Sequence, residues 1–380
     1  MNILIAPNAF KNSLDAEAAA CAIEAGLQQS KLAFSSECFP IADGGDGTGY
    51  LITKRCGGNF YETEVHDPLG RAVTASFGLI DENNTAVIEM ANASGLRLLK
   101  TEELKPLQAT SFGTGEQIKY ALDKGVKNII LCIGGSAVVD GGTGILSALG
   151  VRFLDIDGNK LTGLPENLHK LHTINVSEID RRLAGCQIII LCDVSNPLLG
   201  EQGAAAIFGP QKGASAEEVE TLEKSLSRFA EVTLVQSGKD ISGLKHGGAA
   251  GGTAAGLYAF LNAKLVNGID YFLELTGFES ALKKHDLVIT GEGSLDEQTL
   301  QGKGPYGVAY RAKAQGIPVI GIAGKVPLIP SQKMNEYFDV CIPIGNEPSD
   351  ILSALQATEV NLKRASKEIG NLLALKQGKQ

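Results

Sequence analysis

The chain has 380 residues, of which 44% are apolar and 20% are charged, an ordinary composition for a globular protein. One hydrophobic core rarely grows beyond ~250–300 residues, so we expect two domains. The net charge of −9 argues against a nucleic-acid-binding surface.

The cysteines and the N-terminal segment indicate in which cellular compartment the protein is expected. Seven cysteines are scattered without a CxxC pair, which favours a reducing environment over a disulfide framework. The start, MNILIAPNAFK, lacks the basic and long apolar stretches of a signal peptide. No apolar run approaches the ~20 residues that span a bilayer. We therefore expect a cytoplasmic protein with no membrane or nucleic-acid partner, and a homodimer stays open.

Short apolar runs that end in Gly, Asp or Asn alternate with helical patterns along the chain. Runs that are apolar on both faces are typical of a parallel sheet in an α/β fold. In chain order, the predicted strands are 2–8, 128–135, 187–193, 286–293 and 318–324. The predicted helices are 14–29, 116–124, 216–236, 250–264, 305–315 and 350–374. Ser13 is a favourable N-cap for the first of these helices.

Residues 60–91 do not follow this pattern. Their side chains alternate in polarity and the segment turns at DPLG and DENN, which predicts an antiparallel meander. Clean strand–helix units return after NGID at 267–270. We therefore expect a discontinuous domain of residues 1–60 and 268–380, and an inserted mixed α/β domain of residues 61–267.

The common nucleotide and metal motifs are missing. No stretch fits GxxxxGK[ST], so the chain has no P-loop. TGEGSLDE begins as GxG but has Asp296 where a dinucleotide fingerprint needs its third glycine. HKLH at 169–172 lacks a third ligand, so we expect no zinc site there.

The segment APNAFKNSL (6–14) connects the first predicted strand to the first helix. Free amides at a helix N-terminus attract anions, so Lys11 and Ser13 are candidates for binding phosphate or carboxylate. Alternatively, Ser13 only caps the helix and Lys11 is solvated.

Two acids, Asp43 and Asp46, stand three residues apart in IADGGDGT (41–48). Paired carboxylates suit Mg²⁺, which binds few protein ligands and keeps several waters. Asp is also common in turns, because its side chain bonds local amides. Both interpretations stay open.

The glycine-rich stretch GGSAVVDGGTG (134–144) leads into a predicted helix. Such loops let backbone N–H groups approach an anion, which makes Gly134, Gly135 and Ser136 candidate ligand-binding residues. A tight strand-to-helix turn is the alternative. For HGGAAGGTAAGL (246–257), close helix packing is the better explanation.

An acid ends the apolar run in LCDVSNPLLG (191–200). This residue, Asp193, needs a partner or a cation if it is buried, which favours a functional role. Lys212 stands in a second loop bounded by Gly and Pro, GPQKGAS (209–215).

The densest group of polar residues is DLVITGEGSLDEQTLQGKGP (286–305). Glu292, Asp296 and Glu297 stand close together, and like charges so near one another shift each other's pKa values unless a cation intervenes. Lys303 follows at the far end, where it would offset phosphate charge. A solvated acidic turn is the alternative.

Taken together, these segments resemble the type I glycerate kinases of bacteria, in order and from end to end. The resemblance is carried by the following motifs: APNAFKNSL, PIADGGDGT, DPLGR, AVIEMANASGL, ATSFGTGEQI, IGGSAVVDGGTG, ALGVRFLD, CDVSNPLLG, FGPQKGAS, GGAAGGTAAGL, DLVITGEGSLDEQTLQGKGP and PVIGIAGKV.

The resemblance implies transfer of the γ-phosphoryl group of ATP to D-glycerate with Mg²⁺, and 2-phosphoglycerate as the product. It also implies two α/β domains beside a cleft, the first Rossmann-like and discontinuous. This chain has Val138 and Val139 where many members carry polar residues, so side-chain contacts with substrate at these positions are in doubt. Asn8 and Asn12 replace frequent Asp and Gly, and Asn tolerates the left-handed backbone that a turn at 12 requires.

Phosphoryl transfer mainly requires positioning and charge compensation. The resulting hypothesis makes Asp193 or Asp296 the base that orients the hydroxyl, and Asp43 and Asp46 the metal ligands. Lys11 would act with Lys303 to neutralise phosphate. The remaining candidates for binding substrate or phosphate are Ser13, Gly134, Gly135, Ser136, Lys212, Gly291, Gly293 and Ser294.

Other functions remain open. A kinase in this family could form 3-phosphoglycerate or act on a related small hydroxy acid. A non-catalytic glycerate or nucleotide sensor is a second class, although it would be expected to lose the acids that end the predicted strands. A nicotinamide dehydrogenase is disfavoured by the missing fingerprint.

Overall fold

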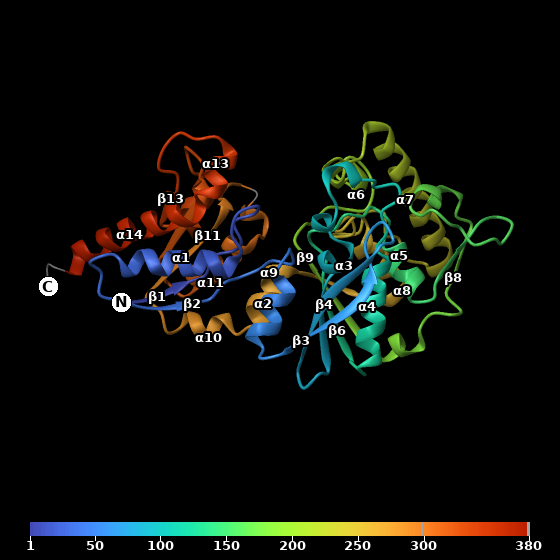
Figure 1. Cartoon of the computed structure of the whole chain (residues 1–380), viewed down its shortest axis with the longest axis horizontal. Coiled ribbons are helices and arrows are strands. Elements are labelled where there is room, and N and C mark those ends of the chain that lie inside the picture. The colour runs from blue at the N-terminus through green and yellow to red at the C-terminus, as the bar shows by residue number, and fades with distance from the viewer. Residues whose placement is uncertain (298, 378–380) are drawn as a thin grey trace. The chain divides into compact units, whose positions relative to one another are not determined.

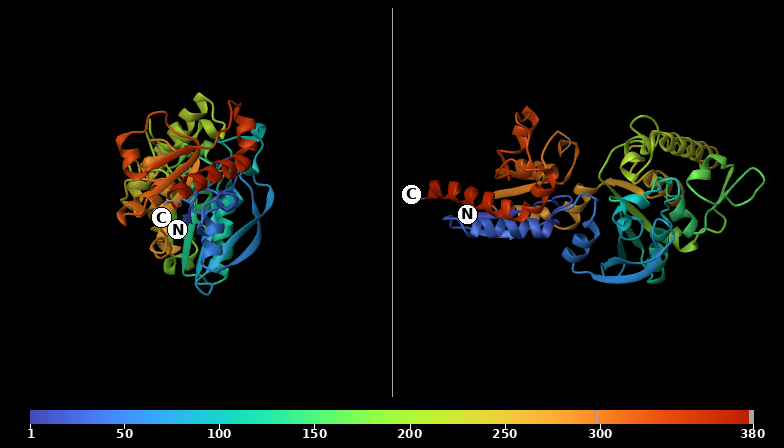
Figure 2. Two further views of the ribbon diagram at one scale, coloured as in Figure 1. Left: turned by 90° about the vertical axis from the view of Figure 1, so that its left-hand side faces the viewer. Right: turned by 45° about the horizontal axis from the view of Figure 1, so that its top comes forward.

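The structure is a computed structural model that describes residues 1–297 and 299–377. The chain forms two compact units (Figures 1 and 2). Unit 1 combines Met1–Asp43 with the described residues from Ile269 onward, and unit 2 is Gly44–Gly268. Both units are α/β, as predicted.

Unit 1 contains a five-stranded parallel sheet in the order β13-β12-β11-β1-β2. Its strands are β1 (Asn2–Ile5), β2 (Ser35–Cys38), β11 (Leu287–Ser294), β12 (Val319–Lys325) and β13 (Val340–Pro343). Its helices are α1 (Ala16–Gln28), α9 (Gly268–Leu275, starting at the boundary), α10 (Phe278–Leu282), α11 (Gly304–Ala314), α12 (Gln332–Tyr337), α13 (Ile351–Gln356), α14 (Thr358–Gln377) and the 3₁₀ turn η6 (Thr299–Gln301).

Alternation along the strands divides the core of unit 1 between the two faces of the sheet. Ile3 and Ile5 point to the same face and pack with α1 and α14, which run side by side in Figure 1. These helices approach closely at Gly26, where an added Cβ would lie 2.3 Å from the carbonyl O of Lys363. Leu4 and Val288 are fully buried and point to the opposite face.

Unit 2 contains a mixed six-stranded sheet in the order β10-β9-β6-β5-β4-β3. Its strands are β3 (Asn59–His66), β4 (Ala72–Ile80), β5 (Thr85–Glu89), β6 (Asn128–Cys132), β9 (Gln187–Cys192) and β10 (Lys264–Asn267), and β7 (Arg152–Leu154) pairs separately with β8 (Thr173–Asn175). β3, β4 and β5 pair antiparallel, which confirms the predicted meander, while β5, β6, β9 and β10 are parallel.

The helices of unit 2 surround this sheet. They are α2 (Thr48–Arg55), α3 (Met90–Ser94), α4 (Phe112–Asp123), α5 (Thr143–Ala148), α6 (Ala204–Phe208), α7 (Ala216–Ser237) and α8 (Thr253–Leu261). Five 3₁₀ turns connect them: η1 (Leu96–Leu98), η2 (Thr101–Glu103), η3 (Glu166–Lys170), η4 (Arg181–Gly185) and η5 (Pro210–Lys212).

The boundary between the units differs from the predicted one. Residues 44–60, assigned to the discontinuous domain from the sequence, belong to unit 2, and positions 378–380 of that domain lie outside the described residues. The reason is that α2 packs against β4 and β5, and Tyr50 N donates to Glu89 Oε1 at 2.8 Å. Such long-range contacts leave no local sequence signal.

Three helix predictions also need correction. Asp15, not Ser13, caps α1, accepting a hydrogen bond from Ala18 N at 2.7 Å. The predicted helix 350–374 is two helices, with Ala357 as the C-cap of α13. The predicted helix 250–264 ends at Leu261, because Asn262 turns left-handed (φ 52°) and the chain then forms the edge strand β10.

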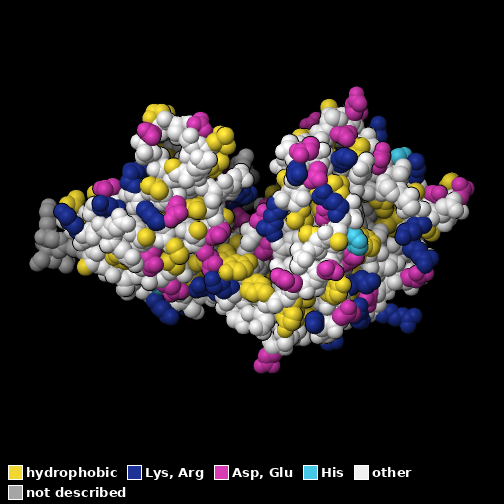
Figure 3. Space-filling model, viewed as in Figure 1, with side chains coloured by type: hydrophobic (Ala, Val, Ile, Leu, Met, Phe, Trp, Pro, Cys, Tyr) yellow, Lys and Arg dark blue, Asp and Glu magenta, His cyan; other side chains and the backbone are white. Residues whose placement is uncertain are grey.

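Surface charge is mixed on the face drawn in Figure 3. Lys and Arg side chains are interspersed with Asp and Glu there, and they form no continuous basic stripe on that face. Among the described residues, no helix combines the length and the apolarity that crossing a membrane requires.

Candidate active site

The sheet of unit 1 changes strand order between β1 and β11. From β1 the chain passes to β2 on one side, whereas β11, β12 and β13 follow one another on the other side. In open parallel sheets, ligands bind outside the carboxyl ends of the strands at such a switch point. The segment that leaves β1 here carries Lys11, and Glu292 lies near the carboxyl end of β11, so these residues lie where this fold binds ligands.

The segment after β1 runs beside β11 before it turns into α1. Asn8 N donates to the carbonyl O of Gly291 at 2.8 Å. Asn12 then adopts a φ of 63°, the left-handed conformation expected to be tolerated by Asn at this turn. The turn leaves Lys11 close enough to Glu292 for its charge to act on that carboxylate.

Glu292 is the buried carboxylate of this region, with 8% of its surface exposed. Burial is the main cause that raises the pKa of Glu292 to about 7, and the carboxylate of Asp43 raises it further. The charges of Lys303 and Lys11 act in the opposite direction, as does a hydrogen bond that Thr299 Oγ1 donates at 3.1 Å. A bound cation would favour the ionised form of Glu292.

Asp43 is held in place by two donors from unit 1. Asn8 Nδ2 donates to Asp43 Oδ2 at 3.1 Å, and the backbone N of Gly304 donates to the same oxygen at 3.4 Å. Gly304 is the first residue of α11, so the carboxylate lies at the N-terminus of this helix. Lys303 is the N-cap residue of the same helix.

The chemistry of this pair fits Mg²⁺. That ion is usually bound through one or two carboxylates and completes its shell with waters and substrate phosphates. Asp43 and Glu292 supply two carboxylates, whereas Asp46, the predicted partner of Asp43, belongs to unit 2. In the part of the chain that the structure describes, no three His, Cys, Asp or Glu side chains form a metal-binding group. A metal held at Asp43 would therefore depend on ligands from the substrates.

Asp296 shapes the loop that follows β11. Ser294 Oγ donates to Asp296 Oδ2 at 3.2 Å, and Thr299 N donates to Asp296 Oδ1 at 3.3 Å. In return, Asp296 N donates to Thr299 Oγ1 at 3.1 Å, so the two residues close the turn that begins η6. Both carboxylate oxygens of Asp296 thus accept hydrogen bonds that stabilise the loop.

The remaining predicted residues of unit 1 have different surroundings. Ser13 Oγ donates to the carbonyl O of Leu355 at 2.5 Å, which ties the β1–α1 segment to α13. Gly291 lies within β11, where an added Cβ would be 1.8 Å from the carbonyl O of Ile322, so strand packing requires a glycine. At Gly293 the nearest such atom is Lys11 N at 3.8 Å, which leaves its backbone open on that side.

In unit 2, the candidate residues gather around a buried lysine, Lys212, of which 4% is exposed. Lys212 Nζ donates to Ser136 Oγ at 3.0 Å and to the carbonyl O of Val138 at 2.6 Å. Burial lowers the pKa of Lys212 to about 7, while the charges of Asp140 and Asp193 act to raise it. The structure thus brings together Lys212, Ser136 and Asp193, which are far apart in sequence.

The glycine loop after β6 approaches the IADGGDGT segment. Gly134 N donates to the carbonyl O of Gly44 at 3.0 Å. Gly135 has a φ of 70°, and a Cβ added there would lie 2.1 Å from Asp46 Oδ1. Because any side chain at 135 would meet this carboxylate, the glycine is required to hold Asp46 beside the loop.

Val138 and Val139 belong to the hydrophobic core. Both side chains are completely buried, in the cluster formed by β6, α5 and α8. Both valine side chains therefore serve core packing in this chain. The backbone of the loop still contributes, since Val138 accepts a hydrogen bond from Lys212.

Two buried acids escaped the sequence analysis as site residues. Glu89, at the end of β5, accepts hydrogen bonds from Gly47 N at 3.2 Å and Tyr50 N at 2.8 Å, and burial raises its pKa. It holds the start of α2 and with it the segment that carries Asp46. An acid after the apolar run AVI is the same signal that identified Asp193.

Asp140 is the second missed acid, and it is fully buried. It accepts hydrogen bonds from Ser111 N at 2.8 Å, Ser111 Oγ at 2.7 Å, Gly142 N at 2.9 Å and Gly144 N at 3.1 Å. These donors fix the loop between Val139 and α5. No local signal distinguishes Asp140 from an ordinary turn residue, because Ser111 reaches it from a distant part of the chain.

Known proteins share this architecture and sequence. The model of the glycerate kinase family matches residues 3–374. The chain is 41% identical over 367 residues to a glycerate kinase of Halalkalibacterium halodurans, and these residues cover 97% of each chain. It is 42% identical over 379 residues to the glycerate 2-kinase of Escherichia coli, covering 99% of this chain and 98% of that protein. A crystal structure assigned to glycerate kinase 2 of Salmonella typhimurium matches with a TM-score of 0.83 and 41% identity, covering 100% of this chain and 99% of the other.

Proposed function

This chain belongs to the glycerate kinase family, and from that premise we propose that it uses ATP and Mg²⁺ to convert D-glycerate into 2-phosphoglycerate. The observation that carries the proposal is the group at the switch point of unit 1. There a buried carboxylate, Glu292, lies within electrostatic reach of Asp43, Lys11 and Lys303. Such a group can receive a metal ion and the phosphates that accompany it.

Within unit 1, the acids and the lysines take different parts of the reaction. Asp43 and Glu292 would hold the magnesium ion. When bound, Mg²⁺ supplies charge neutralisation at the β- and γ-phosphates. Lys11 and Lys303 act on the same negative charge, which grows on the leaving ADP as the bond between its bridging oxygen and the γ-phosphorus breaks.

Within unit 2, the residues around Lys212 can bind D-glycerate, the acceptor of the phosphoryl group. The carboxylate of D-glycerate can pair with Lys212 Nζ, which already donates to Ser136 and Val138, and with the backbone amide of Gly135. A bound carboxylate would favour the protonated form of this lysine. Asp193 follows the buried strand β9 and is near enough to act on Lys212 through its charge.

We assign the proton transfer to Asp193. Its carboxylate accepts the hydroxyl proton of glycerate as the oxygen–phosphorus bond forms. Asp296 is the weaker candidate, because Ser294 and Thr299 already donate to its two oxygens and keep the loop folded. A cytoplasmic location accompanies the proposal and is supported by the seven cysteines, all of which are free thiols.

One experiment tests the reaction and identifies the product. The protein is incubated with D-glycerate, ATP and Mg²⁺, and a proton-coupled phosphorus NMR spectrum is recorded. Phosphorus on the C2 oxygen couples to one carbon-bound proton and gives a doublet, whereas phosphorus on the C3 oxygen couples to two and gives a triplet. We expect the doublet.

The controls separate the alternatives. A triplet would replace the 2-phosphate by the 3-phosphate, and activity on another small hydroxy acid with a higher kcat/KM would change the acceptor. Binding of glycerate without turnover would indicate a sensor. Chelation of divalent ions should abolish the product, and turnover that persists without them would contradict the role of Mg²⁺.

A further inference from the structure

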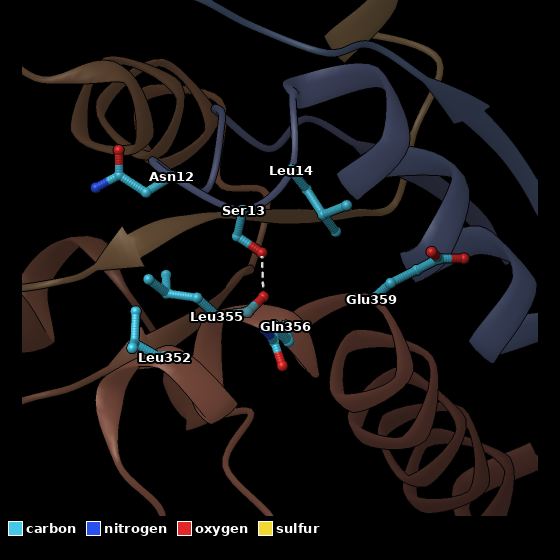
Figure 4. Close-up of a pocket in the computed structure, with 7 residues that line it drawn as sticks. All are labelled: Asn12, Ser13, Leu14, Leu352, Leu355, Gln356 and Glu359. Atoms are coloured by element: carbon cyan, nitrogen blue, oxygen red, sulfur yellow. Dashed lines mark hydrogen bonds between the residues drawn. The ribbon is translucent and has the colours of Figure 1, made fainter. Parts of the chain in front are cut away.

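A cavity of about 380 Å³ lies in unit 1 between the β1–α1 segment and α13 (Figure 4). The segment between β1 and α1 forms one wall, and α13 with the start of α14 forms the opposite wall. Ser13 Oγ spans the two walls through its hydrogen bond to the carbonyl O of Leu355. The volume falls in the range of small-molecule sites, which is ~300–1,000 Å³.

The lining combines apolar surfaces with a few side chains that can donate and accept hydrogen bonds. Leu14, Leu352 and Leu355 supply the apolar surface. Two amide side chains, Asn12 and Gln356, also line the cavity. Three leucines thus share the lining with polar side chains, a mixture that suits a flat heterocycle, because its faces are apolar and its edge carries the donors and acceptors.

The amides narrow the choice of heterocycle. A side-chain amide of Asn or Gln can pair with adenine in a bidentate manner, donating to N7 and accepting from the N6 amine. Glu359 lines the same cavity and can only accept from such an amine. Lys363 Nζ pairs with one oxygen of this carboxylate at 2.5 Å, which fixes its position.

The position of the cavity links it to the phosphate-binding group. Lys11 directly precedes Asn12 in the chain, and its charge acts on Glu292. A ligand that occupies the cavity therefore contacts Asn12, the direct neighbour in the chain of the lysine proposed to bind phosphate. A nucleotide has these two parts, an aromatic base and a chain of phosphates, joined by a short sugar.

We propose that this cavity binds the adenine base of ATP, with Asn12 and Gln356 reading its edge and the three leucines contacting its faces. The inference rests on the proposed function, because it takes ATP as the phosphoryl donor. It adds a site for the base that shares no side chain with the groups assigned to the metal, the phosphates and glycerate.

The sequence offers a direct optical test, because the chain contains no tryptophan. Leu352→Trp places a single indole at the cavity, and Leu352 is 69% exposed, so the larger side chain can be accommodated. The matched control is Ile351→Trp, which lies on the same helix, is 72% exposed and does not line the cavity. Each variant is titrated with the β,γ-imido analogue of ATP and, separately, with inorganic triphosphate, both with Mg²⁺.

Stacking of adenine on the indole should quench the fluorescence of Leu352→Trp with the imido analogue and leave Ile351→Trp unchanged. Inorganic triphosphate, which carries the phosphates without a base, should leave both unchanged. Equal quenching of Leu352→Trp by triphosphate would overturn the proposal, because the cavity would then respond to phosphate and not to the base.

A second variant tests the same site by kinetics. Gln356→Ala should raise the KM for ATP about tenfold or more, with kcat and the KM for D-glycerate nearly unchanged, because one bidentate pair is lost. Gln332→Ala, the same substitution on α12 and outside the cavity, is the control. Normal nucleotide kinetics in Gln356→Ala, together with no quenching in Leu352→Trp, would refute the base site in an active enzyme. If the wild-type protein makes no phosphoglycerate, the proposed function itself has failed, and the fluorescence titration still reports whether the base binds.

Discussion

Each unit buries an ionisable side chain whose pKa is shifted to about 7, and the two groups have opposite charge. In unit 1 burial and the carboxylate of Asp43 raise the pKa of Glu292 to about 7. In unit 2 burial lowers the pKa of Lys212 to about 7, against the charges of Asp140 and Asp193. Unit 1 thus presents a site that is completed by a cation, and unit 2 presents one that is completed by an anion. A kinase needs both, because the metal–nucleotide and the acidic acceptor make opposite electrostatic demands.

The largest expected loss of activity comes from replacing Asp193, the acid that follows β9 in unit 2. Asp193→Asn should lower kcat by about 10²–10⁴-fold, because the variant cannot accept the hydroxyl proton. The midpoint of thermal unfolding should change little, and kcat is measured from ADP release. Asp296→Asn is the comparison and should lower kcat less. Near-normal turnover in Asp193→Asn with a large loss in Asp296→Asn would exchange the two assignments.

The buried lysine should control binding of the acceptor. Lys212→Met should raise the KM for D-glycerate by about 10- to 100-fold, the loss expected for a charge-assisted hydrogen bond, while the KM for ATP stays nearly constant. Lys239→Met is the matched control, since Lys239 Nζ also donates to carbonyl oxygens in unit 2, those of Tyr258 and Ala259. An equal rise in both variants would mean that the effect is structural.

The cation site of unit 1 is tested by the magnesium dependence of turnover. Asp43→Asn should raise the Mg²⁺ concentration for half-maximal rate about tenfold, because one of two carboxylates loses its charge. Asp46→Asn, in unit 2, should leave this concentration nearly unchanged. The opposite result would return the metal to Asp46, as the spacing in IADGGDGT alone allows.

The smallest effect concerns stability and pH. Between the pKa of about 7 in the folded protein and the ordinary value of 10.5, the unfolded chain binds a proton that folded Lys212 does not. The free energy of unfolding should therefore rise with pH by about 1 kcal/mol between pH 7 and pH 8, relative to Lys212→Met. Urea unfolding of both proteins at the two pH values measures the difference. A difference that stays constant or falls with pH would contradict the low pKa.

Strands at the centre of each sheet are predictable, whereas short strands at the edges are not; the longer edge strand β3 was predicted within the meander. All five predicted apolar runs form strands: β1, β6, β9, β11 and β12. The edge strands β2, β10 and β13 were missed, because none of their residues is buried, whereas the equally short β1 has three buried residues. An edge strand is short and partly solvated, so its own composition carries little signal. Whether such a segment forms a strand is decided by its pairing with a central strand.

The candidate site also divides into residues that the sequence predicts and residues that it does not. Asp193, Lys11 and Lys303 were predicted as site residues because charged residues at the ends of apolar runs or beside glycine are conspicuous in any sequence. Two buried acids were not predicted, Asp140 beside Lys212 and Glu89 at the start of α2. Glu89 follows an apolar run and carried a signal that was overlooked, whereas Asp140 accepts hydrogen bonds from the distant Ser111, so no spacing rule reaches it.

By itself, the sequence determined the central strands, the loops that are candidates for chemistry and the family that the chain resembles. These follow from continuous apolar runs, from the residues that end them and from ordered motifs, all of which are local. Tertiary structure decided that Asp43 adjoins Glu292 within unit 1, that Asp46 belongs to unit 2, and that Val138 and Val139 are core residues. The physical reason is that burial and electrostatic neighbours are set by the pairing of distant strands, and these set the pKa of a side chain and the ion it can bind.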